Sequence, residues 1–188
     1  MRGVCAGRRA WRVAVLGVLA LAAGPGGASA RASGCPNASA SATSIGMAAA
    51  RAAVACEVNA RRRAHGRRPL RWSGRLGLAA ERHSLDMVAR RFFAHVSPGG
   101  ATLDRRVRRT GYLRGAHSWI LGEDIGWAEE PIATARRIVR SWMHSPPHRR
   151  VILGREFRQI GIGVARGVPV PGQGDGATFV MDLGEVGW

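Results

Sequence analysis

Residues 119–128 read WILGEDIGWA, and apolar and polar residues alternate there well enough to predict a β-strand that carries the triplet Gly-Glu-Asp. Helical periodicity precedes and follows this strand. The predicted helices cover about residues 45–64, 74–93, 102–111, 131–144 and 146–153. Two further strands, at 158–165 and 177–183, flank a loop rich in Gly and Pro and make a long hairpin. This order is neither βαβ alternation nor all-helical, so it predicts an α+β domain with helices layered on a sheet.

The composition narrows the class of protein further. A chain of 188 residues has the length of a single domain, and its 46% hydrophobic residues exclude an intrinsically disordered protein. All 29 basic residues are Arg, and 12 acidic residues leave a net charge of +17. Such a charge suits anionic polymers, anionic lipid headgroups or nucleic acid. Two pairs of Arg, at 105–106 and 108–109, form one basic side of a predicted helix. Aromatic residues are not interleaved with them, so we do not expect a nucleic-acid groove.

The first thirty residues have the pattern of a signal peptide. Four Arg lie within the first twelve residues, an apolar run covers 13–23, and the small residues Ala-Ser-Ala end at position 30. The apolar run is shorter than the roughly 18 residues that a membrane-spanning helix needs. We therefore expect a secreted protein that begins at Arg31 and carries a net charge of +13. A retained N-terminal anchor is the alternative.

Two cysteines remain once Cys5 leaves with the signal peptide. An even pair in an oxidising compartment predicts a disulfide between Cys35 and Cys56, with free buried thiols as the alternative. Residues 31–44 are mainly Ala, Ser, Gly and Thr without periodicity, so we expect a flexible tail. The disulfide would tether this tail to the first helix.

Four short segments place His, acidic and Ser residues beside apolar ones. They read AERHSLDM (80–87), FFAHVSP (92–98), GEDIGW (122–127) and WMHSPPHR (142–149), and FRQIGIGV (157–164) follows them. In these motifs the chain resembles the CAP superfamily, the domain shared by cysteine-rich secretory proteins, antigen 5 and plant pathogenesis-related proteins, in its bacterial secreted branch. The resemblance runs from about residue 53 to residue 183, and it places one such domain at residues 45–188.

The resemblance implies a three-layer α-β-α sandwich with an open central cleft that holds two His and usually two acidic residues. His95, Glu123 and His148 match three of these positions. Ser145 falls where many members place the second acid, so a four-residue set is broken here. Asp124 stands where Asn is commoner, and we expect it to cap or to accept a hydrogen bond.

Two imidazoles and a carboxylate suit a divalent metal, and zinc binds His nitrogen readily. His148 is the third residue after the expected helix cap Ser145, where the positive end of the helix dipole disfavours imidazolium and keeps the ring able to bind metal. Glu123 would be either a third ligand or a residue that orients one imidazole. The chain has neither the zinc-protease helix signature nor a Gly-x-Ser-x-Gly motif.

His83 lies on the apolar face of the second predicted helix, which favours a hydrogen-bonded structural role. With Asp86 it forms the His-Ser-x-Asp-Met motif of bacterial members, in which Asp86 would orient a neighbouring loop. Ser84 and Ser97 lie near His83 and His95 in sequence, but a helix-surface Ser and a turn Ser do not by themselves indicate a nucleophile.

These observations favour a secreted, non-enzymatic CAP-domain protein whose cleft binds a divalent metal, zinc first, or a small or lipid ligand. Two alternatives stay open. One is a metal-dependent extracellular hydrolase of peptide or cell-wall substrates, with Glu123 as general base. The other is a cationic module that interacts with the envelope through an anionic polymer or an extracellular protein. No transmembrane segment follows the signal peptide.

Overall fold

The apolar runs predicted to be strands pair into one mixed sheet. The computed structural model describes residues 34–170 and 174–188. The strands are β1 (Arg71–Trp72), β2 (Ser118–Glu129), β3 (Gln159–Arg166) and β4 (Gly176–Gly187). Their order across the sheet is β1-β3-β4-β2, with β4 antiparallel to β2 and β3, and β1 parallel to β3. The predicted hairpin is therefore confirmed, and β2 lies at an edge of the sheet.

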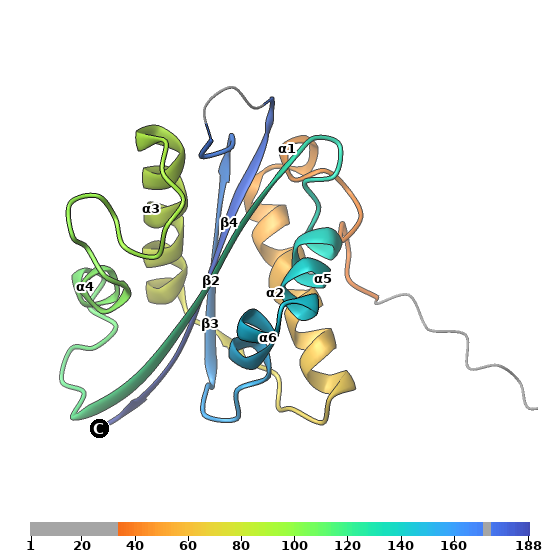
Figure 1. Ribbon diagram of the computed structural model, residues 1–188. Coiled ribbons are helices and arrows are strands. Elements are labelled where there is room, and N and C mark those ends of the chain that lie inside the picture. Colours follow the sequence, from red (N-terminus) through yellow and green to blue (C-terminus); the bar gives the residue numbers. More distant parts are fainter. Residues whose placement is uncertain (1–33, 171–173) are drawn as a thin grey trace, which may run out of the picture. The chain divides into compact units, whose positions relative to one another are not determined.

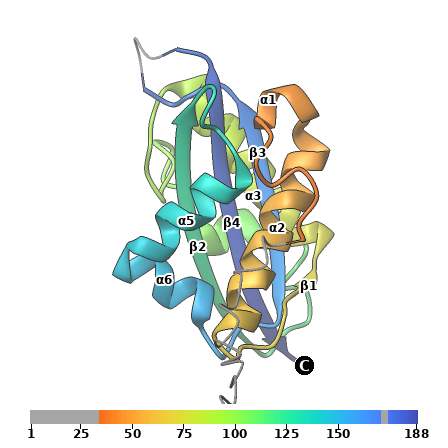
Figure 2. The same ribbon diagram turned by 90° about the vertical axis from the view of Figure 1, so that its right-hand side faces the viewer.

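Helices cover both faces of this sheet (Figures 1 and 2). On one face lie α1 (Ala42–Ile45), α2 (Met47–Ala64), α5 (Ala135–His144) and α6 (Pro146–Leu153). On the other face lie α3 (Gly74–Arg90) and α4 (Leu103–Arg109). The α+β class and the three-layer α-β-α sandwich are thus confirmed.

The two faces of the sheet bury separate cores. The larger core packs β3 and β4 against α2 and α5, with Val58, Trp142 and Phe179 almost fully buried. A smaller core on the opposite face holds Leu76 and Val107, from α3 and α4. Because β4 is covered on both sides, its residues 176–184 are all buried, as expected of a central strand with few polar positions.

Glycines in β3 let α3 lie directly on the sheet. A Cβ atom at Gly161 would lie 2.0 Å from the backbone nitrogen of Gly77, and one at Gly163 would lie 2.2 Å from the carbonyl carbon of Ala80. No side chain fits at these distances. The motif FRQIGIGV therefore has a packing role, because it brings α3 close enough to shape the loop that follows it.

Two helix boundaries differ from the prediction. The third main helix begins at Ala135 and not at Pro131, which lies in the preceding turn. Thr134 caps the helix instead, and its side chain accepts a hydrogen bond from the backbone nitrogen of Arg137 (3.2 Å). The helix predicted over 74–93 ends at Arg90, because Arg91 takes a left-handed conformation with φ of 54°.

The segment that precedes α2 is part of the fold, which corrects the prediction of a flexible tail over its described residues, 34–44. Ala38 and Ala42 are buried. The backbone nitrogen of Ala42 donates to the carbonyl of Ala133 (2.9 Å), and that of Arg136 donates to the carbonyl of Ala38 (2.8 Å). The small side chains of this segment, from which flexibility was predicted, allow it to pack closely against the loop before α5 and the start of that helix. The domain therefore begins before Ile45.

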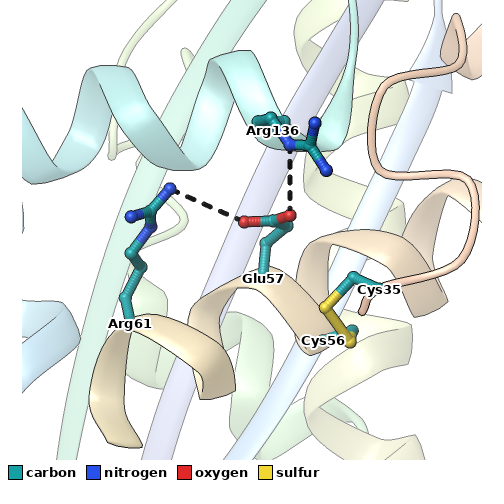
Figure 3. Close-up of a disulfide and its surroundings, with 5 residues drawn as sticks. All are labelled: Cys35, Cys56, Glu57, Arg61 and Arg136. Carbon is teal, nitrogen blue, oxygen red and sulfur yellow. Dashed lines mark ion pairs between the residues drawn. A yellow bond between two sulfur atoms is a disulfide. The ribbon is translucent and has the colours of Figure 1, made fainter. Parts of the chain in front are cut away.

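The predicted disulfide joins Cys35 to Cys56 across a sequence separation of 21 residues (Figure 3). It links the N-terminal segment to α2, as expected. The predicted signal peptide, residues 1–30, and its cleavage site lie outside the described residues. Within the described part of the chain, no helix has the length and hydrophobicity to span a membrane.

Candidate functional site

The edge strand β2 brings together residues from both helical layers. Glu123 lies on β2, and His95 lies in the loop between α3 and α4, on one side of the sheet. His148 lies on α6, on the other side. Both α4 and α6 contact β2. The two sequence motifs therefore flank the same edge strand, one from each helical layer.

Glu123 is the centre of a buried network. Its side chain is 3% exposed, and Oε1 accepts a hydrogen bond from Nδ1 of His95 at 2.8 Å. Its other oxygen, Oε2, accepts from Nη2 of Arg106 at 2.5 Å. Arg106 also donates from Nη1 to the carbonyls of His95 (2.8 Å) and Ala101 (2.9 Å). One arginine thus neutralises the carboxylate and fixes the loop that carries His95.

The network sets the protonation of both partners. Burial opposes ionisation of Glu123, but the hydrogen bond with His95 and the positive charge of Arg106 outweigh it and hold its pKa below the usual value. The same hydrogen bond raises the pKa of His95 above the usual value, although burial acts in the opposite direction. A carboxylate only accepts hydrogen bonds, so Nδ1 of His95 is the donor, and neutral His95 keeps its lone pair on Nε2.

The imidazole of His95 is held but not enclosed. Its side chain is 54% exposed while the carboxylate behind it is buried. Both oxygens of Glu123 are engaged, one by His95 and one by Arg106. Of the two roles predicted for Glu123, this geometry favours orienting His95 over binding a metal directly.

His148 occupies the third position of α6 and is half-buried. Burial, and to a lesser extent the nearby charge of His95, lower its pKa, so the ring is neutral at neutral pH. Ser145 stands at the N-cap of α6 as predicted, with an extended backbone, but its side chain makes no capping hydrogen bond. Ser145 is half-buried as well and lies one turn before His148.

His83 on α3 contacts the backbone of the loop that carries His95. It is fully buried, and its Nε2 contacts the carbonyl oxygen of Ala94 at 3.1 Å. Burial lowers its pKa, so the neutral ring donates from Nε2 to Ala94. Asp86 pairs with Arg90 on its own helix (3.5 Å). A cavity of about 430 Å³ opens beside this loop, and its lining includes His83, Asp86, Ser97 and Arg106.

Sequence reasoning missed one buried acid and misjudged another. Asp182 lies directly opposite Glu123 on β4, and burial, reinforced by the charge of Glu123, raises its pKa well above the usual value. Asp124, expected to cap or to accept a hydrogen bond, is fully buried and finds no hydrogen-bond partner among the described residues. Burial and then the charge of Glu123 raise the pKa of Asp124 to about 8. The fold therefore favours the protonated form of both acids.

The donors available for a metal are few. Over residues 34–170 and 174–188, no three or more His, Cys, Asp or Glu side chains are grouped so that they could hold a metal ion. His95 offers Nε2, and His148 offers a neutral imidazole nearby. Two nitrogen donors are fewer than the four ligands that zinc usually takes, so ligands from outside the chain would have to complete its coordination.

Comparison with known proteins agrees with the fold. The chain is 32% identical over 106 residues to the uncharacterized protein YkwD of Bacillus subtilis, and the match covers 56% of this chain and 38% of that protein. An extracellular protein containing an SCP domain, from Bacillus anthracis, matches with a TM-score of 0.59 and 23% identity over 73% of this chain and 40% of its own. The chain thus spans less than half the length of these two relatives.

A third similar protein is an outer surface protein of Borrelia burgdorferi. Its structure matches with a TM-score of 0.58 and 18% identity, over 71% of this chain and 90% of its own. The family model described as the cysteine-rich secretory protein family, CAP, matches residues 56–180. Because this match covers more than half of the chain and includes the residues around Glu123 and His148, the protein belongs to the CAP family.

Proposed function

We propose that this CAP-domain protein is secreted, is not an enzyme, and binds a divalent metal ion, zinc first, at His95 and His148. One observation carries the proposal. His95 has its Nδ1 fixed by a buried carboxylate while 54% of its side chain stays exposed. A ring held in this way presents Nε2 to solvent in a defined tautomer, as metal-binding histidines do.

Each residue of the site has a separate role in this proposal. His95 and neutral His148 supply the nitrogen donors. Glu123 and Arg106 position His95 and do not contact the metal. Zinc held by two nitrogens would keep open positions, and these would accept a carboxylate or phosphate group of a small ligand.

The same geometry disfavours the hydrolase alternative. A general base needs a carboxylate oxygen that is free to take a proton from water. In Glu123 one oxygen accepts from His95 and the other from Arg106, and the pKa of the group lies below its usual value. Glu123 is therefore a poor base, which supports binding over turnover.

Secretion is supported by the predicted signal peptide and by two relatives that are described as extracellular and as an outer surface protein. The N-terminal sequence of exported material tests this part of the proposal. It should begin at Arg31, whereas material that begins at Met1 would contradict export with cleavage.

Calorimetric titration of metal-free secreted protein with zinc tests the site. We expect a dissociation constant on the order of micromolar for the wild type, since two nitrogen donors bind zinc more weakly than three or four do. His95→Ala and His148→Ala should each abolish binding. His117→Ala, which removes an exposed histidine outside the site, should leave it unchanged.

Circular dichroism establishes that all variants are folded. Absence of binding by the folded wild type, or equal binding by all three variants, would refute the two-histidine site. Turnover of a defined peptide or cell-wall fragment that is lost in His95→Ala would instead establish the hydrolase.

A further inference from the structure

A second candidate site lies in the helical layer that contains α2, α5 and α6. A cavity of about 820 Å³ opens between α2 and α5, bounded also by the loop before α5 and by the start of α6. Its lining contains no acidic side chain among the described residues. The cations that line it are Arg61, Arg136, Arg137, Arg140 and Arg149. We call this cavity the arginine groove, and it does not include His95 or Glu123.

The arginine groove is held in shape by a buried acid. Glu57 on α2 is fully buried, and its carboxylate lies 3.8 Å from Nη2 of Arg61 and 3.5 Å from Nε of Arg136 (Figure 3). The disulfide at Cys56, the residue before Glu57, links α2 to the N-terminal segment. At one end, Nη2 of Arg149 contacts a ring nitrogen of His65 at 3.2 Å. Glu57 thus links α2 to α5 beneath the positively charged surface of the groove.

The positive charge is spread along the groove. On α5 the lining cations run from Arg136 to Arg140, about 6 Å along the helix at a rise of 1.5 Å per residue. Arg61 on α2 and Arg149 on α6 extend the positive charge beyond α5. A single anionic headgroup would need cations gathered at one point, whereas this spread matches several negative charges in a row.

The rest of the lining combines polar side chains, Ser39, Thr134 and two His, with apolar ones. The apolar residues are Pro131, Ile132, Met143 and Pro146, and Ile132 is 46% exposed. These apolar side chains can pack against short carbon units. Among the described residues, no Phe, Tyr or Trp side chain lines the cavity, so the large aromatic rings on which nucleic-acid bases commonly stack are missing, which disfavours single-stranded DNA or RNA.

We propose that the arginine groove binds an extended polyol-phosphate polymer, a chain of phosphodiester groups joined by short hydroxylated carbon units. Arg137 and Arg140 contact successive phosphates, and the carbon units lie on Ile132 and Met143. The guanidinium group suits this ligand, because it donates several hydrogen bonds to phosphate in a fixed plane. The site is independent of the proposed function at His95 and His148.

Fluorescence anisotropy with a labelled synthetic oligomer of glycerol phosphate tests the proposal. Arg137 and Arg140 are exposed and, unlike Arg61 and Arg136, are not paired with Glu57, so their removal should leave the fold intact. Arg137→Ala/Arg140→Ala should weaken binding by at least about tenfold at low salt. The slope of log affinity against log salt concentration should become shallower by about 1.4, the value for two phosphate contacts on a single strand.

The matched control is Arg105→Ala/Arg109→Ala, which removes the same charge from exposed positions of α4, on the opposite face of the sheet. It should change affinity less than twofold, and so should His95→Ala. Equal losses in the two double variants would show that overall charge alone drives binding, and would overturn the site. Equal affinity for a single-stranded oligonucleotide, or binding only to vesicles of phosphatidylglycerol, would overturn the assigned ligand.

Discussion

A single residue, Glu123, connects the parts of the proposed metal site. Its buried carboxylate is the middle member of a hydrogen-bonded chain that runs from Arg106 to the exposed ring of His95. Its ionised form is maintained against burial by these two partners. Consequently, the pKa and the tautomer of His95 depend on Glu123, a residue that is almost fully buried.

The pKa of His95 tests this dependence. Glu123 raises it, so Glu123→Gln should lower the pKa of His95 relative to the wild type. Titration of the imidazole resonances by NMR measures the shift. An unchanged pKa of His95 in a folded variant would show that the hydrogen bond to Glu123 does not control the ring.

Asp124 should make stability depend on pH. Its pKa is about 8 in the fold against 3.8 for the ordinary group, so the folded state favours its protonated form. Unfolding releases this proton as pH rises above about 4, and stability falls until the pH passes the folded value. Asp124→Asn should therefore lose less stability between pH 5 and pH 8, by up to about 1.4 kcal/mol per pH unit. Denaturant melts of the two proteins measure this difference, and parallel pH profiles would contradict it.

The sequence singled out His95, Glu123 and His148 as a candidate site because each lies in a motif that resembles the CAP family. It could not reveal Arg106, one of several Arg in a helix that reads as a solvated face. Nor could it reveal Asp182, which becomes a neighbour of Glu123 only through the register of β2 and β4. Residues that become neighbours only in the folded chain cannot be recognised from the sequence around each of them.

At the scale of elements, the contact of α3 with β3 depends on glycine. Gly163→Ala would place a Cβ atom 2.2 Å from the backbone of α3, and it should destabilise the domain by roughly 3 kcal/mol or more. Gly99→Ala is the control, because no atom lies within 4 Å of the added Cβ. Thermal melts of the two variants compare them, and similar midpoints would show that α3 moves away without cost.

The disulfide should stabilise the link between the N-terminal segment and α2. Closing a loop of 21 residues contributes roughly 3 kcal/mol by restricting the unfolded chain. Reduction should lower the melting midpoint by about 6–12 °C for a domain of this size. Calorimetry with and without reductant measures this shift, and Cys35→Ser/Cys56→Ser should not respond. An unchanged midpoint after complete reduction would contradict the stabilising role.

The ends of helices could be predicted where a local residue, such as a proline in the first turn, marks the boundary. The short helix after Ser145 begins at Pro146 as predicted, since proline favours the first helical turn. The same rule failed at Pro131, where Thr134 provides the cap and pairs with Ser41 in a backbone bridge. That pairing joins segments far apart in the sequence, so no local pattern could have anticipated it.

At the scale of the whole molecule, the fold holds two candidate sites of different chemistry. The site at Glu123 lies at the edge strand β2, and the arginine groove lies between α2 and α5. The order of helices and strands sufficed to predict the layered fold. The arginine groove was not predictable, because its lining comes from segments between residues 39 and 149 that meet only in the folded chain.

The nitrogen shifts of His95 and His148 during zinc addition provide the most direct test of the metal site. In ¹⁵N-labelled protein we predict that His95 without metal carries its proton on Nδ1, held by Glu123. On zinc addition, Nε2 of His95 and one ring nitrogen of His148 should shift together, while the Nδ1 proton is retained. No shift at saturating zinc, or loss of the Nδ1 proton from His95, would contradict a site in which Glu123 orients His95 for metal binding.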